Sequence, residues 1–495
     1  MYNCQLSSLN ELLIFKTMSK IEYSYLTLPT LFYERVLPHC LPKPEITLLN
    51  QALLNVLGIP DNNLPKLLSF LQLADPNPDA QTFAQAYAGH QFGHFTMLGD
   101  GRAIIVGEWV QTENLRYDIQ LKGGGRTKYS RGGDGKATFK AMLREYLISE
   151  AMFHLNIATS RSLGVIKTGE WVQREMAVEG AVLPRIMKSH IRIGTFEFAR
   201  HFGTLNDLTA LCNYSINRLY PQLKTKENTA AALLETVMVS QINLICEWMR
   251  VGFIHGVMNT DNVAISGETF DYGPCAFMNT YNPNTVYSSI DRDGRYAFKN
   301  QANICKWNIT RFAEALLPLL HTEEEKAILI AKEIIGTFDQ IWVNQYYKTM
   351  LLKLGITEVN ISLCNCVNEL LTIMEEEQMD YTNTFLALGN PDFVAETHHC
   401  SERFSTWRNN WEKYIENSIG LSKAQAIMQV NNPAFIPRNH EVEKALDEMS
   451  MGNAKPFENL LQVLQNPYTY NPTFHSYTNP PQSEFDKKFK TFCGT

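Results

Sequence analysis

The chain has 495 residues, of which 45% are hydrophobic and 19% are charged, and its formal net charge is -7. This composition is typical of globular proteins and excludes an intrinsically disordered chain. Acidic and basic residues are mixed along the sequence, which argues against a nucleic-acid surface but leaves room for local basic pockets that hold a small anion. We therefore expect an enzyme-sized protein of two or three lobes with no nucleic-acid partner.

No membrane partner is expected, because no window approaches about 18 uninterrupted apolar residues. The most apolar predicted helix, 230–253, contains Glu235, Glu247 and Arg250. Residues 1–17 lack the basic segment and the cleavage site of a secretory signal, and we interpret them as an extension or a mis-assigned start. Ten scattered cysteines fit a reducing compartment, so we expect a cytoplasmic protein.

In chain order, the first regular elements predicted are two strands, over 102–109 and 115–122, where short alternating runs are bounded by glycine and polar residues. Residues 137–155 follow with apolar side chains at helical spacing. The helical period is strongest over 234–249, and Gly252 stands where that helix would end.

Beyond about residue 305 the predicted elements are almost all helical. The main ones cover 311–320, 323–354 and 367–379. A strand-rich first part and a helical remainder indicate an α+β protein with two lobes.

Glycines and cations surround the two predicted strands. Gly99, Gly101 and Arg102 stand directly before the first, where a backbone without side chains can approach a phosphate, although alone this is a weak signal. Lys122 ends the second strand, and Glu145 lies in the helix that follows. A strand lysine held by a helix carboxylate is how kinase-like folds present a cation to nucleotide phosphates.

A second set of polar residues follows the strongest predicted helix, in the motif HGVMNTDN at 255–262 and the motif DYG at 271–273. Asn262 and Asp271 stand where kinase-like phosphotransferases carry their two magnesium ligands. The apolar residues between them predict a strand hairpin.

The usual kinase base is missing from this loop, because its position, five residues before the asparagine, holds Val257. Asp261 is the nearby carboxylate that can take a proton from a hydroxyl nucleophile. Arg185 and Arg192 lie where the strand-rich part gives way to the helical part, and their forked guanidinium groups suit a polyphosphate. The spacing of His90 and His94 could suit a metal ion, but the sequence shows no third ligand for it. We therefore interpret both histidines as structural or pocket residues.

Together these segments resemble one family, the selenoprotein O family of protein adenylyltransferases, whose members resemble protein kinases but lack the usual catalytic base. The matching motifs are YAGHQFG (87–93), LGDGR (98–102), QLKGGGRT (120–127), YSRGGDG (129–135), RIGTFE (192–197), HGVMNTDN (255–262) and DYGP (271–274). The resemblance is dense over residues 20 to 320 and looser beyond.

The resemblance implies a protein-kinase-like fold with a strand-rich N-lobe, a mainly helical C-lobe and a C-terminal extension. It also implies that ATP lies reversed relative to a kinase, so that AMP is transferred to Ser, Thr or Tyr hydroxyls of proteins with Mg2+ or Mn2+ present. The site residues implied are nucleotide-binding Gly99, Gly101, Arg102, Lys122, Asp134, Gly135, Glu145, Arg185, Arg192 and Asp271, metal-binding Asn262 and Asp271, and the base Asp261.

The expected units are an N-lobe over 18–190, a C-lobe over 191–420 and a C-terminal extension and tail over 421–495. Cys493 resembles a redox-active residue near the end of many family members, with Cys275 as a conceivable disulfide partner. Two alternatives remain open, a kinase-like phosphotransferase and a non-catalytic nucleotide-binding pseudokinase scaffold.

Overall fold

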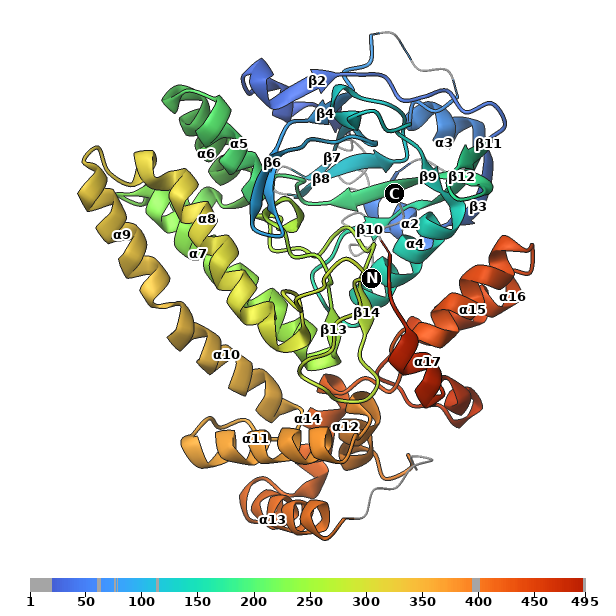
Figure 1. Cartoon of the computed structure of the whole chain (residues 1–495), viewed down its shortest axis with the longest axis vertical. Coiled ribbons are helices and arrows are strands. Elements are labelled where there is room, and N and C mark those ends of the chain that lie inside the picture. Colours follow the sequence, from blue (N-terminus) through green and yellow to red (C-terminus); the bar gives the residue numbers. More distant parts are fainter. Residues whose placement is uncertain are drawn as a thin grey trace, which may run out of the picture.

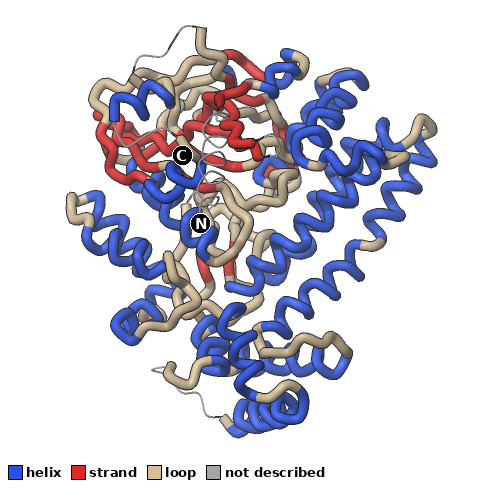
Figure 2. The backbone as a smooth tube through the Cα atoms, turned by 180° about the vertical axis from the view of Figure 1, so that it is seen from behind, coloured by secondary structure: helices blue, strands red, loops and turns tan. Residues whose placement is uncertain are grey.

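The structure is a computed structural model that describes residues 20–59, 64–74, 77, 79–112, 115–393 and 401–492. The expected extension 1–17 and Cys493 lie outside these residues. Strands gather in the first part of the chain and helices fill the rest, as Figure 1 shows from one side and Figure 2 from behind. The predicted α+β class is therefore confirmed.

A ten-stranded antiparallel sheet forms the N-terminal part. Its main path runs β2 (Tyr33–Arg35), β4 (Phe83–Gln85), β7 (Ala103–Thr112), β8 (Leu115–Lys122), β12 (Ala177–Met187), β11 (Gly164–Gln173) and β3 (Glu45–Leu49). The additional strands are β1 (Lys20–Glu22), which pairs with β7, and β9 (Ala137–Thr138) and β10 (Arg161–Ser162), which pair with β12. The predicted strands correspond to β7 and β8.

Side chains alternate between the two faces of this sheet, and the alternation positions the site. Val182 and Ile186 of β12 pack in the apolar cluster formed with α2 (Gln51–Leu57) and α3 (Leu64–Phe70). Leu183, one position along, joins the main core with α4 (Phe139–His154). Every second residue of β12 counted from Leu183 therefore faces α4, and Arg185 is one of these residues.

The predicted helix over 137–155 is observed as α4, which begins two residues later. Ala137 and Thr138 pair with β12 as the short strand β9, and the Thr138 hydroxyl then accepts a hydrogen bond from the Ala141 amide. This side-chain bond satisfies one of the free amides of the first turn and fixes the start of the helix.

The helical region surrounds the long central helix α7 (Thr229–Val251). The other helices are α5 (Ile193–Phe202), α6 (Leu205–Leu219), α8 (Gln301–Leu320), α9 (Glu324–Gly336), α10 (Phe338–Leu352), α11 (Ile361–Glu376), α12 (Tyr381–Gly389), α13 (Glu402–Ser418), α14 (Leu421–Asn431), α15 (Asn439–Ser450), α16 (Lys455–Leu464) and α17 (Ser483–Lys488). Gly252 ends α7 with φ 74°, as its position predicts.

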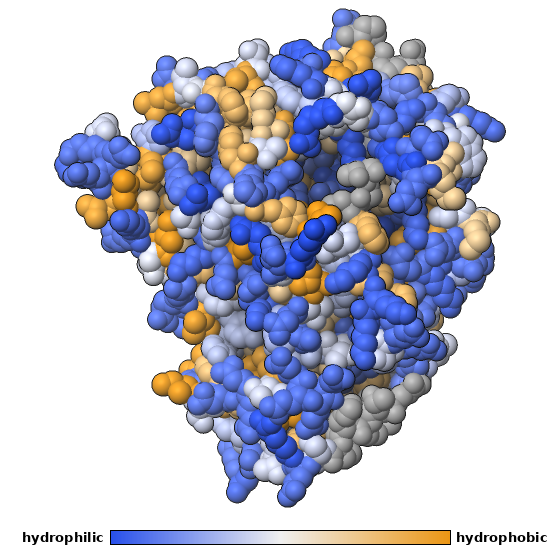
Figure 3. Space-filling view, viewed as in Figure 1, coloured by the Kyte–Doolittle hydropathy of each residue, from blue (hydrophilic) through white to orange (hydrophobic). Residues whose placement is uncertain are grey.

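Within the described part of the chain, α7 is the one helix that is long and apolar enough to cross a membrane by length and composition. It packs against α8 and α10, and 56% of its most apolar window is buried inside the protein. On the face of the molecule in Figure 3, hydrophilic side chains predominate and apolar ones are scattered.

Three helix predictions need correction. The helix predicted over 311–320 is α8, which begins ten residues earlier, at Gln301, directly after the 3-10 turn Phe298–Asn300. The helix predicted over 323–354 is two helices, α9 and α10, which separate at Gly336 and Thr337. Glycine is a poor helix former, and the Thr337 hydroxyl donates a hydrogen bond back to the Ile334 carbonyl at 2.7 Å. The helix predicted over 367–379 is α11, which begins earlier because the Asn360 side chain caps it by accepting from the Leu363 amide.

The strand hairpin predicted between Asn262 and Asp271 is wrong, because the structure shows two isolated bridges to other segments, from Ala264 to Arg192 and from Thr269 to Thr159. Backbone hydrogen bonds join residues 263–265 to 191–193 and residue 269 to 158–160, so this stretch forms a turn at 264–267 and pairs with two earlier segments. Two small antiparallel pairs lie near the site, β5 (Ala88–Gln91) with β6 (His94–Met97), and β13 (Phe253–Ile254) with β14 (Ala276–Phe277).

Candidate active site

A cavity of about 410 Å3 lies where the sheet meets the helical region. Eleven of the twelve predicted site residues line it, namely Gly99, Gly101, Arg102, Lys122, Asp134, Gly135, Arg185, Arg192, Asp261, Asn262 and Asp271. The twelfth, Glu145, lies behind Lys122 and lines a neighbouring cavity. The structure thus brings together residues that are spread over more than 170 positions of the sequence.

Two cations and two carboxylates meet at the inner end of this cavity. Lys122 Nζ donates to Glu145 Oε2 at 2.5 Å and also contacts Asp271. Arg185 approaches Glu145 Oε1 through Nε at 2.8 Å and through Nη2 at 2.5 Å, and its Nη2 lies 3.6 Å from Asp271 Oδ1. Glu145 therefore holds both cations, and the pattern of a strand lysine with a helix glutamate is observed as predicted.

The charges of this cluster set the pKa values of its carboxylates. Burial alone would raise the pKa of Glu145, but Arg185 and Lys122 outweigh it and lower that pKa below its ordinary value. Burial likewise opposes ionisation of Asp271, and Lys122 and Arg185 again outweigh it and hold the pKa well below its usual range. Both carboxylates stay charged at neutral pH.

Asp271 adopts a left-handed backbone conformation with φ 65°, which is uncommon for a residue other than glycine. Its side chain is about a third exposed, 34%, on the side of the cavity. Strained conformations of this kind concentrate at functional sites, where the surrounding structure maintains them.

Arg192 lines the cavity and contacts residues from separate segments of the chain. Its Nη1 donates to the Asp261 carbonyl at 3.2 Å, its Nη2 lies 3.6 Å from Asp100 Oδ1, and the guanidinium carbon lies 3.9 Å from the ring centroid of Tyr87. Asp100 in turn accepts from the Gln85 amide and from the Gln120 side chain. A buried guanidinium with this many partners is held in one orientation.

Two glycines that line the cavity, Gly99 and Gly135, leave no space for a side chain. A Cβ at Gly99, where φ is 132°, would lie 2.3 Å from the ring of Tyr129, and one at Gly135 would lie 2.2 Å from the backbone of Gly125. Asp134, next to it, forms an ion pair with Arg174 at 2.8 Å on the rim of the cavity. Tyr129 begins the motif YSRGGDG but was not assigned to the site, and Arg174 lies outside every motif found in the sequence, so neither was predicted as a cavity residue.

The proposed base lies on a short 3-10 turn, η5 (Thr260–Asn262). Asp261 is 7% exposed, and burial raises its pKa to about 6 against the opposing charge of Arg192. Within the described residues its Oδ1 has no hydrogen-bond partner. A buried carboxylate with a free oxygen is poised to accept a proton near neutral pH.

Asn262 lies on the same turn, and its side-chain nitrogen donates to the Val257 carbonyl at 3.1 Å. This bond orients the amide, whose oxygen is the end that a cation needs. No group of three or more His, Cys, Asp or Glu side chains that could hold a metal occurs in the described ranges. An amide oxygen and a carboxylate do fit Mg2+, which commonly takes one or two protein ligands and completes its shell with phosphates and water.

The two histidines predicted as structural or pocket residues lie in different surroundings. His90 Nδ1 lies 2.5 Å from Glu197 Oε1, whereas His94 is exposed on the next strand. The contact with Glu197 gives His90 a structural role.

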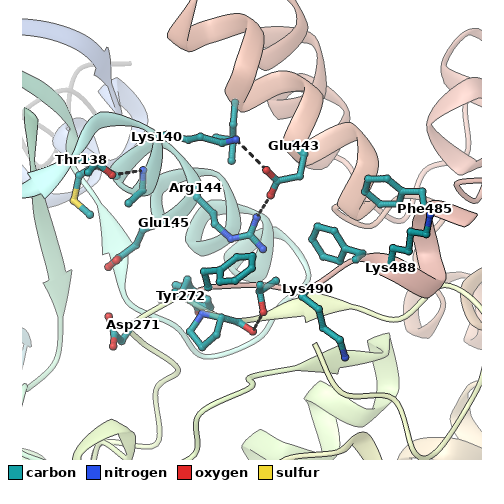
Figure 4. Close-up of a pocket in the computed structure, with 18 of the residues that line it drawn as sticks. Thr138, Lys140, Arg144, Glu145, Asp271, Tyr272, Glu443, Phe485, Lys488 and Lys490 are labelled. Atoms are coloured by element: carbon teal, nitrogen blue, oxygen red, sulfur yellow. Dashed lines mark hydrogen bonds and ion pairs between the residues drawn. The ribbon is translucent and has the colours of Figure 1, made fainter. Parts of the chain in front are cut away.

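A second cavity, of about 980 Å3, adjoins the first at Lys122 and Asp271. In Figure 4, Lys140 and Arg144 of α4 both point to Glu443 of α15, which accepts from them at 3.1 and 2.9 Å. The C-terminal segment closes the other side, where the Thr491 hydroxyl donates to the Pro274 carbonyl at 2.7 Å. Cys275 is buried here.

A buried cluster of cations beside a free carboxylate, an amide oxygen and a glycine-lined cavity defines a site for group transfer from a polyphosphate. Residues 17–465 match the family model described as protein adenylyltransferase SelO. The chain therefore belongs to the SelO family of protein adenylyltransferases, and the resemblance seen in its motifs is confirmed.

Relatives match over nearly the whole length. The protein nucleotidyltransferase YdiU of Clostridium perfringens (strain ATCC 13124) is 46% identical over 483 residues, which cover 97% of this chain and 98% of the relative. The protein of the same name from Brevibacillus brevis is 48% identical over 476 residues, 95% of this chain and 97% of the relative. The protein of the same name from Alkaliphilus metalliredigens is 45% identical over 486 residues, which cover 97% of this chain and 99% of the relative.

Proposed function

We propose that this protein transfers AMP from ATP to Ser, Thr or Tyr hydroxyls of other proteins and releases pyrophosphate. The observation that carries the proposal is the separation of charge in the cavity. Lys122 and Arg185 bind Glu145 and lie beside Asp271, whereas Asp261, the proton acceptor, lies on η5 of the helical side, where Arg192 donates to its backbone carbonyl. Membership of a protein adenylyltransferase family supports the same reaction.

The nucleotide orientation follows from where the cations lie. Lys122 and Arg185 are 6% and 4% exposed, and buried cations of this kind are best matched by the most highly charged part of ATP, its outer phosphates. We propose that the outer phosphates lie at this inner end and that the α-phosphate faces Asp261. The arrangement also supports a protein-kinase-like fold in which the sheet is the N-lobe (18–190) and the α5 to α13 region the C-lobe (191–420), followed by an extension (421–495).

In the proposed step, the acceptor hydroxyl oxygen forms a bond to the α-phosphorus while Asp261 takes its proton. The bond between the α-phosphorus and the oxygen that bridges to the β-phosphate breaks, and pyrophosphate leaves with that electron pair. Lys122 and Arg185 stabilise the charge that develops on the leaving group, and Glu145 keeps both cations in place.

Asn262 and Asp271 are the residues that would hold Mg2+, or Mn2+, when the nucleotide is bound. The ion then supplies positive charge to the phosphate oxygens. Asp271 is ionised over the whole working pH range, as a ligand must be, because Lys122 and Arg185 lower its pKa. From the composition of the chain, we also propose that the protein is cytoplasmic and has no nucleic-acid or membrane partner.

The test is to incubate the purified protein with a protein acceptor, magnesium and ATP labelled at the α- or the γ-phosphate. We expect label only from the α position, with the mass of AMP on the acceptor, and none in Asp271→Ala. Label only from the γ position would make the protein a kinase. If the protein binds ATP but transfers no label to itself or to a panel of acceptors, with either magnesium or manganese, it is a scaffold and the proposal is wrong.

A further inference from the structure

The β5–β6 hairpin packs directly on the carboxylate of Asp261. A Cβ at Gly89 of β5 would lie 2.4 Å from Asp261 Oδ1 and 2.8 Å from its Cβ, so any side chain at this position would displace the carboxylate. Gln91, two residues along on the same face of the strand, lines the same cavity as Asp261. The hairpin is therefore one wall of the pocket in which Asp261 lies.

The hairpin is joined to the turn that carries Asp261 by two hydrogen bonds. The His90 amide donates to Thr260 Oγ1 at 2.8 Å, and the Phe92 amide donates to Asn259 Oδ1 at 3.1 Å. Both acceptors are side chains directly preceding Asp261. A shift of the hairpin would therefore be transmitted to the turn.

Glu197 of α5 completes the connection. Thr260 donates its hydroxyl to Glu197 Oε2 at 2.5 Å, and the other carboxylate oxygen, Oε1, lies 2.5 Å from His90 Nδ1. Glu197 is only 2% exposed, and both of its oxygens are used. Thr260 uses its hydroxyl as donor and as acceptor, so it is the point at which hairpin, turn and α5 meet.

We propose that Thr260 and Glu197 are positioning residues for Asp261. They hold the turn η5, which carries Asp261, against the β5–β6 hairpin. The inference rests on the proposed function, in which Asp261 takes the acceptor proton. Because Asp261 Oδ1 has no hydrogen bond within the described ranges, packing against Gly89 and the fixed turn determine its place. A base must lie within hydrogen-bonding distance of the proton that it removes, and a displacement of about 1 Å can cost about 100-fold in rate.

Thr260→Val and Thr260→Ser form a matched pair that tests this role. Valine keeps the shape and removes the hydroxyl, which leaves the His90 amide and one Glu197 oxygen without their partner, whereas serine keeps the hydroxyl. We expect Thr260→Ser to retain kcat within about threefold and Thr260→Val to lose about 10- to 100-fold, with KM for ATP unchanged in both. Thermal unfolding of both variants identifies any loss of folded protein.

Gly89→Ala is a second variant, in case Thr260→Val does not fold. The backbone at Gly89 is outside the left-handed region, so alanine fits the strand but would push on the Asp261 carboxylate. We expect a lower kcat with an unchanged KM for ATP. Equal kcat in Thr260→Val and Thr260→Ser, or wild-type kcat in Gly89→Ala, would overturn the inference.

A failure of the proposed function looks different, since the wild type itself would then transfer no AMP. The variants are therefore compared only after transfer of α-label by the wild type has been measured. A fall in ATP affinity as large as the fall in kcat would contradict a role directed at Asp261 and point instead to Asn262, which lies on the same turn.

Discussion

Glu145→Gln is the most informative change at the cation cluster, because it removes one charge and almost no volume. In the wild type, two buried cations face two carboxylates, so the cluster is neutral before ATP binds. The variant leaves Lys122 and Arg185 with Asp271 alone. Removing one partner of a buried ion pair costs about 3–5 kcal/mol, and we expect a loss of that size in the free energy of unfolding.

ATP should offset part of this loss, since its phosphates bring negative charge to the two cations. We therefore expect magnesium and ATP to raise the melting temperature of Glu145→Gln more than that of the wild type. The KM for ATP should be unchanged or lower, while kcat falls about 10- to 100-fold because Lys122 has lost its anchor. Denaturant unfolding, thermal unfolding with and without ATP, and transfer of α-label measure the three quantities.

Glu150→Gln is the matched control on the same helix. Glu150 is 4% exposed and binds Arg161 through both oxygens, at 2.8 and 2.6 Å, without lining the cavity. We expect a comparable loss of stability, no extra rescue by ATP and a wild-type kcat. The reasoning fails if Glu145→Gln has the same kcat as Glu150→Gln, or if ATP raises the melting temperature of both variants equally.

Three further predictions concern other parts of the site. Asp271→Asn keeps the shape but not the charge of the proposed metal ligand, and should reduce metal-dependent AMP transfer at least about 100-fold, measured over a magnesium titration. Asp261 must be ionised to accept a proton, and its pKa is about 6, so kcat/KM should fall about tenfold per pH unit below pH 6 and level off above it. A flat profile between pH 5 and 7 would exclude this residue as the base. Gly135→Ala combines φ 72° with a clash against Gly125, so it should lower the denaturation midpoint, whereas Gly132→Ala, which meets nothing within 4 Å, should lower it much less.

Local patterns in the sequence predict the parts of the fold that depend on local forces. β7, β8, α4 and α7 could be located because alternation, helical period and a terminal glycine are read within a single window. The hairpin predicted between Asn262 and Asp271 failed for the opposite reason. Its backbone groups bond to residues 191–193 and 158–160, about 70 and 110 positions earlier, and no local pattern reports those partners.

The site divides in the same way. Lys122, Glu145, Asn262 and Asp271 were predictable because their chemistry appears in recognisable spacings. The role of Glu197 was not, although this residue ends the motif RIGTFE, because only the fold shows that it joins His90 to Thr260.

Asp261 and Asp271 lie ten positions apart and line one cavity, yet their environments move their pKa values in opposite directions. Asp271 faces Lys122 and Arg185 and stays ionised, which suits a cation ligand but makes a poor proton acceptor. Asp261 is buried against the backbone of Gly89 with Arg192 as its main opposing charge, so its affinity for a proton is higher. The proposed division of labour between metal ligand and base therefore rests on the surroundings of each carboxylate and not on residue type. It follows that, with ATP in the proposed orientation, moving a carboxylate to Val257, the usual kinase position, would not by itself turn this site into a kinase, because the cations would still hold the outer phosphates away from the acceptor.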